Sequence, residues 1–157
     1  MSLPPLEAPL LPRADWLQVV RHAPLVSIDL ILRDAQGRVL LGLRENEPAR
    51  GTWFVPGGVI RKDETLDTAF TRIARNELGL PLERRLASLL GVYEHHYTTN
   101  FALEPGVSTH YVVLGHSLEL DGEYAPADRQ HRELRWWPLA ELMASPAVHA
   151  NVKAYFP

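Results

Sequence analysis

Glu77 stands out among the ionisable residues because helical spacing places it on an apolar face. At about 100° per residue, a helix in this region puts five apolar side chains on one stripe: Leu66, Phe70, Ile73, Ala74 and Leu78. Glu77 points along the same stripe. An ionised carboxylate there needs a cation, strong donors or a metal ion, unless it turns out to solvent from the last helical turn. Glu77 taken alone leaves both interpretations open.

Three further residue types in the chain could do chemistry. Asp29 is a charge inside an apolar, β-branched segment and therefore requires a partner. Arg44 follows an apolar strand, where a fixed guanidinium could stabilise an anionic leaving group or simply be solvated. His131 lies in a polar loop, and an imidazole can take a proton from water near neutral pH. The chain has seven histidines, so His131 could equally be a solvated loop residue.

A glycine pair precedes the helix at a spacing that gives it weight. Pro56-Gly57-Gly58 ends a short apolar segment and frees the backbone for close approach to a ligand or ion. From Gly58 the chain runs through five residues to Glu64 and seven more to Arg72. Glu77, Gly79 and Leu80 follow at the end of the expected helix. So many matches at set spacings make a far stronger signal than an isolated glycine pair.

The elements that must position these residues alternate between strands and a few helices. Residues 1–13 carry four prolines and are expected to form an extended arm before a single domain, residues 14–157. Strands are expected at Leu25–Leu32, Val39–Leu43, Trp53–Val55, Leu86–Tyr97, His110–Leu120 and Leu134–Trp137. Helices are expected at Trp16–Arg21 with Asp15 as cap, Thr65–Leu78 with Asp63 or Thr65 as cap and Gly79 at its end, Leu139–Ala144 and Val148–Tyr155. This pattern favours an α+β sandwich.

Composition narrows the possible functions. The 157 residues suit one domain, and 46% hydrophobic with 22% charged content is typical of a globular protein. Absence of cysteine excludes disulfides, thiolate metal sites and cysteine nucleophiles. A net charge of -3 without a basic run argues against nucleic-acid partners, and no apolar run is long enough for a membrane span. We therefore expect a cytoplasmic location, with no membrane partner.

The spacing from Gly58 to Leu80 resembles the Nudix box, G-x5-E-x7-R-E-U-x-E-E-x-G-U, in which U is aliphatic. Ile73 and Asn76 replace two of its glutamates, and Ala74 is small for an aliphatic position. A reduced box of this kind is similar to that of the GDP-mannose mannosyl hydrolases. The similarity extends to the segments Val19–Arg21, Pro24–Ser27, Trp53–Gly58, Lys62–Leu66, His110–Gly115 and Val148–Asn151. It implies a Nudix fold, an α/β/α sandwich with a mixed β-sheet.

That resemblance implies hydrolysis of GDP-mannose, or of GDP-glucose, to GDP and free sugar. Water attacks the anomeric carbon with inversion, and one Mg²⁺ is expected, with Mn²⁺ as a substitute. The ligands would be the Gly57 carbonyl, the Glu77 carboxylate and the Gln130 side chain, an all-oxygen set that suits magnesium. His131 would be the general base. Arg44 would neutralise the departing diphosphate.

The resemblance implies further substrate contacts. Asp29 and Tyr111 match active-site positions, whereas Leu10, Leu11 and Trp16 match a segment that contacts the nucleotide, across a homodimer. A tryptophan face could stack on a purine, and it could equally pack its own helix. Glu64 and Arg72 are interpreted as structural, bracing the loop against the helix.

One departure concerns charge beside the leaving group. The subfamily has an arginine directly after the glycine pair, where this chain has Val59, and Arg61 two residues later could replace it. Two alternatives follow from the reduced box. The chain could be a Nudix pyrophosphohydrolase that cleaves at phosphorus of another nucleoside diphosphate derivative. It could also be a non-catalytic Nudix module that binds a nucleotide.

Overall fold

The computed structural model describes residues 4, 6, 10–120, 124 and 133–157. Its seven-stranded sheet has the order β3-β2-β1-β6-β5, with β4 paired to β1 and β7 to β2. The strands are β1 (Leu25–Arg33), β2 (Val39–Leu43), β3 (Trp53–Phe54), β4 (Gly57–Val59), β5 (Ser88–Tyr97), β6 (Thr109–Glu119) and β7 (Leu134–Trp137). β1 and β6 run parallel and the other pairs antiparallel, so the sheet is mixed.

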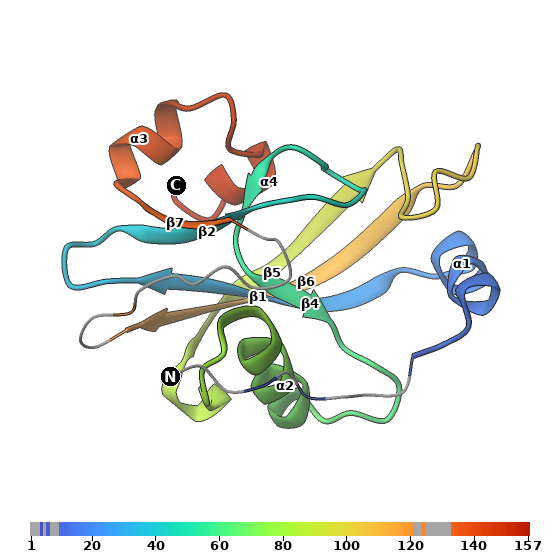
Figure 1. Ribbon diagram of the computed structural model, residues 1–157, viewed down its shortest axis with the longest axis horizontal. Coiled ribbons are helices and arrows are strands. Elements are labelled where there is room, and N and C mark those ends of the chain that lie inside the picture. Colours follow the sequence, from blue (N-terminus) through green and yellow to red (C-terminus); the bar gives the residue numbers. More distant parts are fainter. Residues whose placement is uncertain (1–3, 5, 7–9, 121–123, 125–132) are drawn as a thin grey trace.

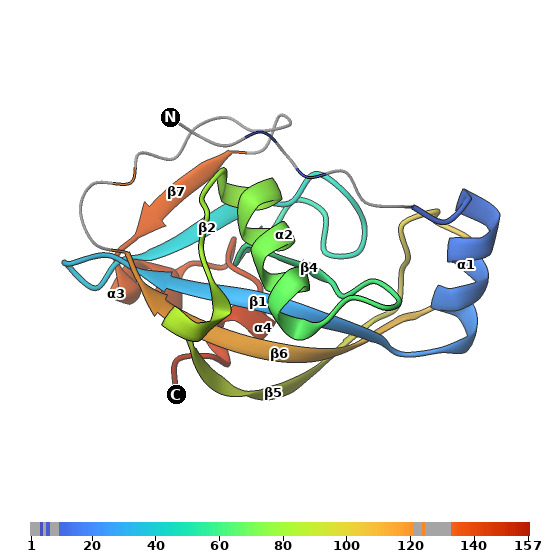
Figure 2. The same cartoon turned by 90° about the horizontal axis from the view of Figure 1, so that it is seen from below.

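Helices cover both faces of this sheet, as Figure 1 shows. The helical segments are α1 (Arg13–His22), α2 (Leu66–Leu78), the 3₁₀ turn η1 (Arg84–Leu86), α3 (Leu139–Ala144) and α4 (Ala150–Lys153). α2 lies on one face, whereas α3 and α4 lie on the other, and α1 lies at the end of the sheet (Figures 1 and 2). The expected α+β fold, an α/β/α sandwich on a mixed sheet, is confirmed.

Alternation along β1 divides the hydrophobic core between the two faces. Ile28, Leu30 and Leu32 are buried against α2. Ile31 belongs to the opposite cluster, which contains residues of α3, α4 and the C-terminal segment. Successive side chains of a strand point to opposite faces, so Asp29 shares the face of Ile31. The carboxyl of Asp29 therefore lies on the face of the sheet that α3 and α4 cover.

α2 follows the sequence prediction closely. Thr65 caps its start by accepting a hydrogen bond from the Thr68 amide, and Gly79 ends it in the left-handed conformation with φ of 69°. Leu66, expected on the buried stripe, is instead 39% exposed, because the buried part of the helix begins at Ala69.

The other predicted boundaries differ where local geometry intervenes. α1 begins at Arg13, directly after Pro12, so Asp15 lies in its first turn and does not cap it, and the arm ends one residue earlier than expected. β5 begins at Ser88 because residues 84–86 form the 3₁₀ turn. The strand expected at Trp53–Val55 ends at Phe54, and the helix expected at Val148–Tyr155 is limited to Ala150–Lys153.

No helix among the described residues combines the length and the apolar character that a membrane span requires.

Candidate active site

An open pocket of about 230 Å³ lies where β1, β2, β4, β5 and β6 meet the last turn of α2. Five of the residues selected from sequence line it: Asp29, Arg44, Gly57, Glu77 and Tyr111. They come from β1, β4, α2, β6 and the loop after β2, and they span more than half the chain. The fold therefore brings together an acidic pair, one cation and an exposed stretch of backbone.

Asp29 lies at the centre of β1, opposite Gly57 on β4 and Gly115 on β6. The Tyr155 hydroxyl donates a hydrogen bond of 2.5 Å to its Oδ2. Burial, with a smaller contribution from Glu77, raises the pKa of Asp29 to about 7, against the opposing effects of the Tyr155 hydrogen bond and the Arg44 charge. Asp29 is therefore present as both acid and carboxylate near neutral pH.

Gly57 is required by the close approach of β4 to β1. A Cβ at this position would lie 2.4 Å from Asp29 Oδ1 and 2.7 Å from the Ile28 carbonyl oxygen, distances that no side chain could occupy. At Gly58 a Cβ would meet only the Ile73 side chain, at 3.1 Å. The backbone of Gly57 thus lies in the pocket wall beside Asp29.

Glu77 lies in the last turn of α2, is half-buried and lines the same pocket as Gly57. It is close enough to Asp29 to raise the pKa of that carboxyl. A glutamate oxygen and a backbone carbonyl are hard donors of the kind that Mg²⁺ and Mn²⁺ prefer. These two residues fit a divalent ion, with Gly57 close-packed so that only backbone is presented on that side.

The residues that replace two glutamates of the Nudix box lie outside the pocket. Ile73 is 1% exposed and packs in the core under α2. The Asn76 side chain pairs with Leu6 of the arm, accepting from its amide at 2.7 Å and donating to its carbonyl at 3.3 Å. Position 73 therefore belongs to the core and position 76 to the contact with the arm, and neither lines the pocket.

The Arg44 guanidinium is held at the pocket rim. Its Nε donates to the Pro48 carbonyl at 2.8 Å, and its Cζ lies 5.9 Å from the centre of the Phe54 ring. Its charge opposes the rise that burial causes in the pKa of Asp29, and it adds to the lowering that burial causes in the pKa of His149. Arg44 therefore supplies positive potential to the interior of the pocket.

Sequence reasoning missed the aromatic residues His95 and Tyr97, which form a further wall of the pocket. Burial lowers the pKa of His95 to about 4, with contributions from His149 and His96, and burial raises the pKa of Tyr97 to about 12. The Asn151 amide donates to the Tyr97 hydroxyl at 3.1 Å. Alternation in β5, which puts His95 and Tyr97 on one face, was the available signal. The wall presents neutral polar groups and ring faces near neutral pH.

Glu64 and Arg72 brace the loop after β4 against α2. Arg72 donates two hydrogen bonds to the Glu64 carboxylate, at 2.7 and 2.9 Å, and one to the Val59 carbonyl at 2.8 Å. The Arg72 guanidinium, through these hydrogen bonds, holds the pKa of Glu64 below its usual value. This is the bracing arrangement expected from sequence.

The remaining predicted residues lie elsewhere. Leu10 and Leu11 are 76% and 53% exposed, and Trp16 packs against Phe101 with ring centres 6.4 Å apart, so none of the three lines this pocket. Val59 lines it, whereas Arg61 does not. Gln130 and His131 lie outside the described residues.

Comparison with known proteins agrees with this architecture. A family model for the Nudix domain matches residues 23–156. Over 125 residues the chain is 45% identical to the low-salt glycan biosynthesis protein Agl8 of Haloferax volcanii, covering 80% of this chain and 78% of that protein. A shorter match, 37% identical over 70 residues, covers 45% of this chain and 40% of an ADP-ribose pyrophosphatase of Methanocaldococcus jannaschii.

A solved structure gives the same result at the level of the fold. The MutT Nudix hydrolase of Burkholderia pseudomallei is 26% identical, with a TM-score of 0.65, over 85% of this chain and 96% of that chain. The family model alone covers most of the sequence, including the glycine pair, α2 and both sides of the pocket. The chain belongs to the Nudix domain family and is a hydrolase of that family.

Proposed function

We propose that this hydrolase cleaves a nucleoside diphosphate sugar, with GDP-mannose as the first candidate, GDP-glucose as the second and Mg²⁺ as the cofactor. The products are the nucleoside diphosphate and the free sugar, formed with inversion by attack of water on the anomeric carbon. The observation that carries this proposal is where the three acidic positions of the Nudix box lie in the structure. Glu77 lines the pocket, whereas positions 73 and 76 are occupied by a core residue and an arm contact. A sparse metal site is suited to assisting a leaving group.

The proposed ion is held by the Glu77 carboxylate and the Gly57 carbonyl. Gln130, the third ligand expected from sequence, lies outside the described residues. When bound, the ion supplies Lewis-acid stabilisation of diphosphate charge. Nudix enzymes generally use divalent ions, and the oxygen donors present favour Mg²⁺ or Mn²⁺.

The chain's own groups bind and orient the rest of the substrate. Arg44, fixed by Pro48 and Phe54, binds the diphosphate and stabilises the negative charge that it gains on departure. Asp29 and Tyr111, which line the same pocket, hold sugar hydroxyls by hydrogen bonds. His131 accepts the proton of the attacking water.

The relative from Haloferax volcanii supports a nucleotide-sugar substrate. Its name places that protein in glycan biosynthesis, a process that consumes activated sugars. The ADP-ribose pyrophosphatase supports the alternative, cleavage at phosphorus, over a smaller part of the chain.

Isotope labelling separates these two reactions. Hydrolysis in ¹⁸O-water is expected to place the label in the free sugar, with the nucleoside diphosphate unlabelled. Label in a phosphate, with sugar phosphate and nucleoside monophosphate as products, would establish the pyrophosphohydrolase reaction instead. A panel of GDP-, UDP- and ADP-sugars, each with and without Mg²⁺, identifies base and sugar. Magnesium-independent binding without turnover of any of them would identify a nucleotide-binding module.

Glu77→Gln tests the metal-binding role directly. We expect turnover to fall by about 10²- to 10³-fold, because an amide oxygen is a weaker ligand for Mg²⁺ than a carboxylate. Glu141→Gln, an exposed change on α3, is the matched control and should leave turnover unchanged. Equal rates in the two variants would exclude Glu77 from the site.

The arm contributes a second part of the proposal. We propose that Leu10, Leu11 and Trp16 meet the nucleotide of a second copy in a homodimer. Exposure of Leu10 and Leu11 leaves them available for such a contact. Sedimentation equilibrium of the protein and of a Leu10→Ser, Leu11→Ser variant tests it, since the variant should be shifted toward monomer.

A further inference from the structure

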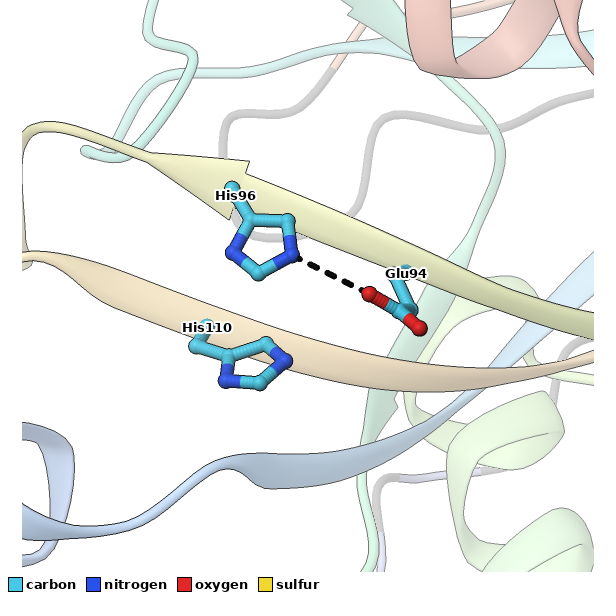
Figure 3. Close-up of side chains that lie close together, drawn as sticks. All are labelled: Glu94, His96 and His110. Carbon is cyan, nitrogen blue, oxygen red and sulfur yellow. Dashed lines mark hydrogen bonds and ion pairs between the residues drawn. The ribbon is translucent and has the colours of Figure 1, made fainter.

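Three potential metal ligands lie together on β5 and β6, outside the active-site pocket. Glu94 and His96 belong to β5, and His110 belongs to β6. One ligand atom from each lies within 4.8 Å of the others, and Figure 3 shows the three side chains side by side above the two strands. None of them lines the pocket that holds Glu77.

Strand geometry explains both the cluster and its separation from the pocket. Glu94 and His96 are two residues apart and so share a face of β5, while His96 and His110 are directly paired across the two strands. His95 lies between them on β5 and points the other way, into the pocket. The cluster therefore occupies the opposite face of the same two strands.

Helix α2 packs on this face of the sheet but does not cover the cluster. Leu114, four residues after His110 and on its side of β6, packs against the core under α2. Figure 2 shows β5 and β6 running along the edge of the sheet beyond α2. Glu94 and His96 are exposed, with side-chain accessibilities of 72% and 63%, so an ion can reach them from solvent.

The contacts already made hold the side chains near one another. His96 Nε2 lies 3.3 Å from Glu94 Oε2, and the His96 and His110 rings stack with centres 4.3 Å apart and planes at 24°. Tetrahedral zinc with bonds of about 2.1 Å needs ligand atoms about 3.4 Å apart. The ligand atoms all lie within 4.8 Å of one another, a spread that rotation of the side chains about their own bonds can close.

We propose that Glu94, His96 and His110 form a binding site for a late first-row divalent ion, Zn²⁺ foremost, that links β5 to β6. Two imidazoles and one carboxylate are the donors that such ions prefer, whereas Mg²⁺ prefers oxygen alone. The fourth coordination position faces solvent and takes water. The two sites of the molecule thus differ in metal preference, and each can be loaded separately.

The site would also affect the pocket through the strands that both share. His95 follows Glu94 directly, and Tyr111 follows His110, so a bound ion fixes the spacing of the strands that present these two pocket residues. Among the described strands, β5 lies at one edge of the sheet and pairs with β6 alone. A metal link to β6 therefore stabilises an edge strand of the sheet.

Zinc titration of metal-free protein against a chromogenic chelator, in excess Mg²⁺, tests the proposal. We expect one equivalent of Zn²⁺ to bind and the dissociation constant to rise by more than about 100-fold in His110→Ala, because loss of a ligand should exceed loss of an outer partner. His96→Ala should behave alike. His22→Ala, an exposed histidine on α1, is the matched control and should bind zinc normally.

Melting temperatures distinguish zinc bound at this cluster from zinc bound in the pocket. They also show whether a variant that loses zinc binding is still folded. Zn²⁺ should raise the melting temperature of the unaltered protein and of Glu77→Gln but not of His110→Ala. Without zinc, the melting temperatures of His110→Ala and His22→Ala should match, which shows that both variants fold. Unchanged zinc affinity in His96→Ala and His110→Ala, or loss of zinc binding in Glu77→Gln, would overturn the proposal. These outcomes do not depend on which substrate the pocket takes.

Discussion

The Tyr155 hydroxyl hydrogen-bonds to the carboxyl of Asp29, joining residues 126 positions apart at the buried side of the pocket. The bond opposes the effect of burial, which raises the pKa of Asp29 to about 7. A carboxyl whose pKa is raised on folding contributes stability at pH below its ordinary value of 3.8, and that contribution is lost as pH rises through about 7. Tyr155 therefore influences both the charge of Asp29 and the free energy that burying its carboxylate costs.

Tyr155→Phe should raise the pKa of Asp29 above about 7, because burial then acts without the opposing donor. We expect unfolding free energy to fall by about 1–3 kcal/mol at pH 8, where the carboxylate is left short of a donor. Carboxyl ¹³C NMR and urea denaturation measure the two effects. Combining it with Asp29→Asn closes a double-mutant cycle, and strictly additive energies would show that the pair is not coupled.

Gly57→Ala should disrupt the contact between β4 and β1. Its methyl group would meet Asp29 Oδ1 and the Ile28 carbonyl, so the strands must separate, at a cost of about 3 kcal/mol. Gly58→Ala is the matched control, because its methyl group meets the Ile73 side chain at 3.1 Å and no backbone atom as close, and it should cost about 1 kcal/mol. Urea denaturation of the two variants compares them, and equal losses would contradict the packing described.

Glu64→Gln should destabilise the fold by about 2 kcal/mol at pH 7, because it leaves the buried Arg72 guanidinium without its anionic partner. The pKa of Glu64 is lowered on folding, so its contribution is present above 4.5, the ordinary value, and is lost as pH falls through the lower folded value. Thermal melts between pH 7 and pH 3 should show the two proteins converging in acid. A constant difference across that range would exclude the ion pair as its origin.

His131→Gln should lower turnover by about 10²- to 10⁴-fold, because glutamine cannot take the proton of the attacking water. Substrate affinity should change little. Steady-state kinetics on the substrate identified from the panel give kcat and KM separately, with His22→Gln as the control. A normal kcat would remove His131 from the mechanism.

Local signals in the sequence were sufficient for most of the fold. Helix α2 follows from its cap at Thr65, its apolar spacing and Gly79, each acting within a few residues. Burial of Leu66 was predicted wrongly, because helical periodicity shows which face is apolar but not how far along the helix that face packs against the sheet. The family pattern likewise selected Asp29, Arg44 and Tyr111, which line the pocket together with Gly57 and Glu77.

Relationships that depend on strand register could not be obtained in this way. The His95 and Tyr97 wall and the cluster of Glu94, His96 and His110 require knowing which residue of β6 lies opposite each residue of β5. The sequence predicts both strands but not their pairing, since the connecting loop fixes it. The bond from Tyr155 to Asp29 has the same origin, because it joins two distant parts of the chain.

Register also restricts how the length of β5 can vary among relatives. A one-residue insertion between Tyr93 and Glu94 would exchange the two faces beyond it, bringing His96 into the pocket and turning His95 outward. An irregularity in pairing between Leu89 and Gly91, nearer the start of the strand, can absorb an extra residue without that exchange. Homologous chains should therefore carry their insertions and deletions before Gly91 or in the loop beyond Tyr97, and keep the stretch between them at constant length.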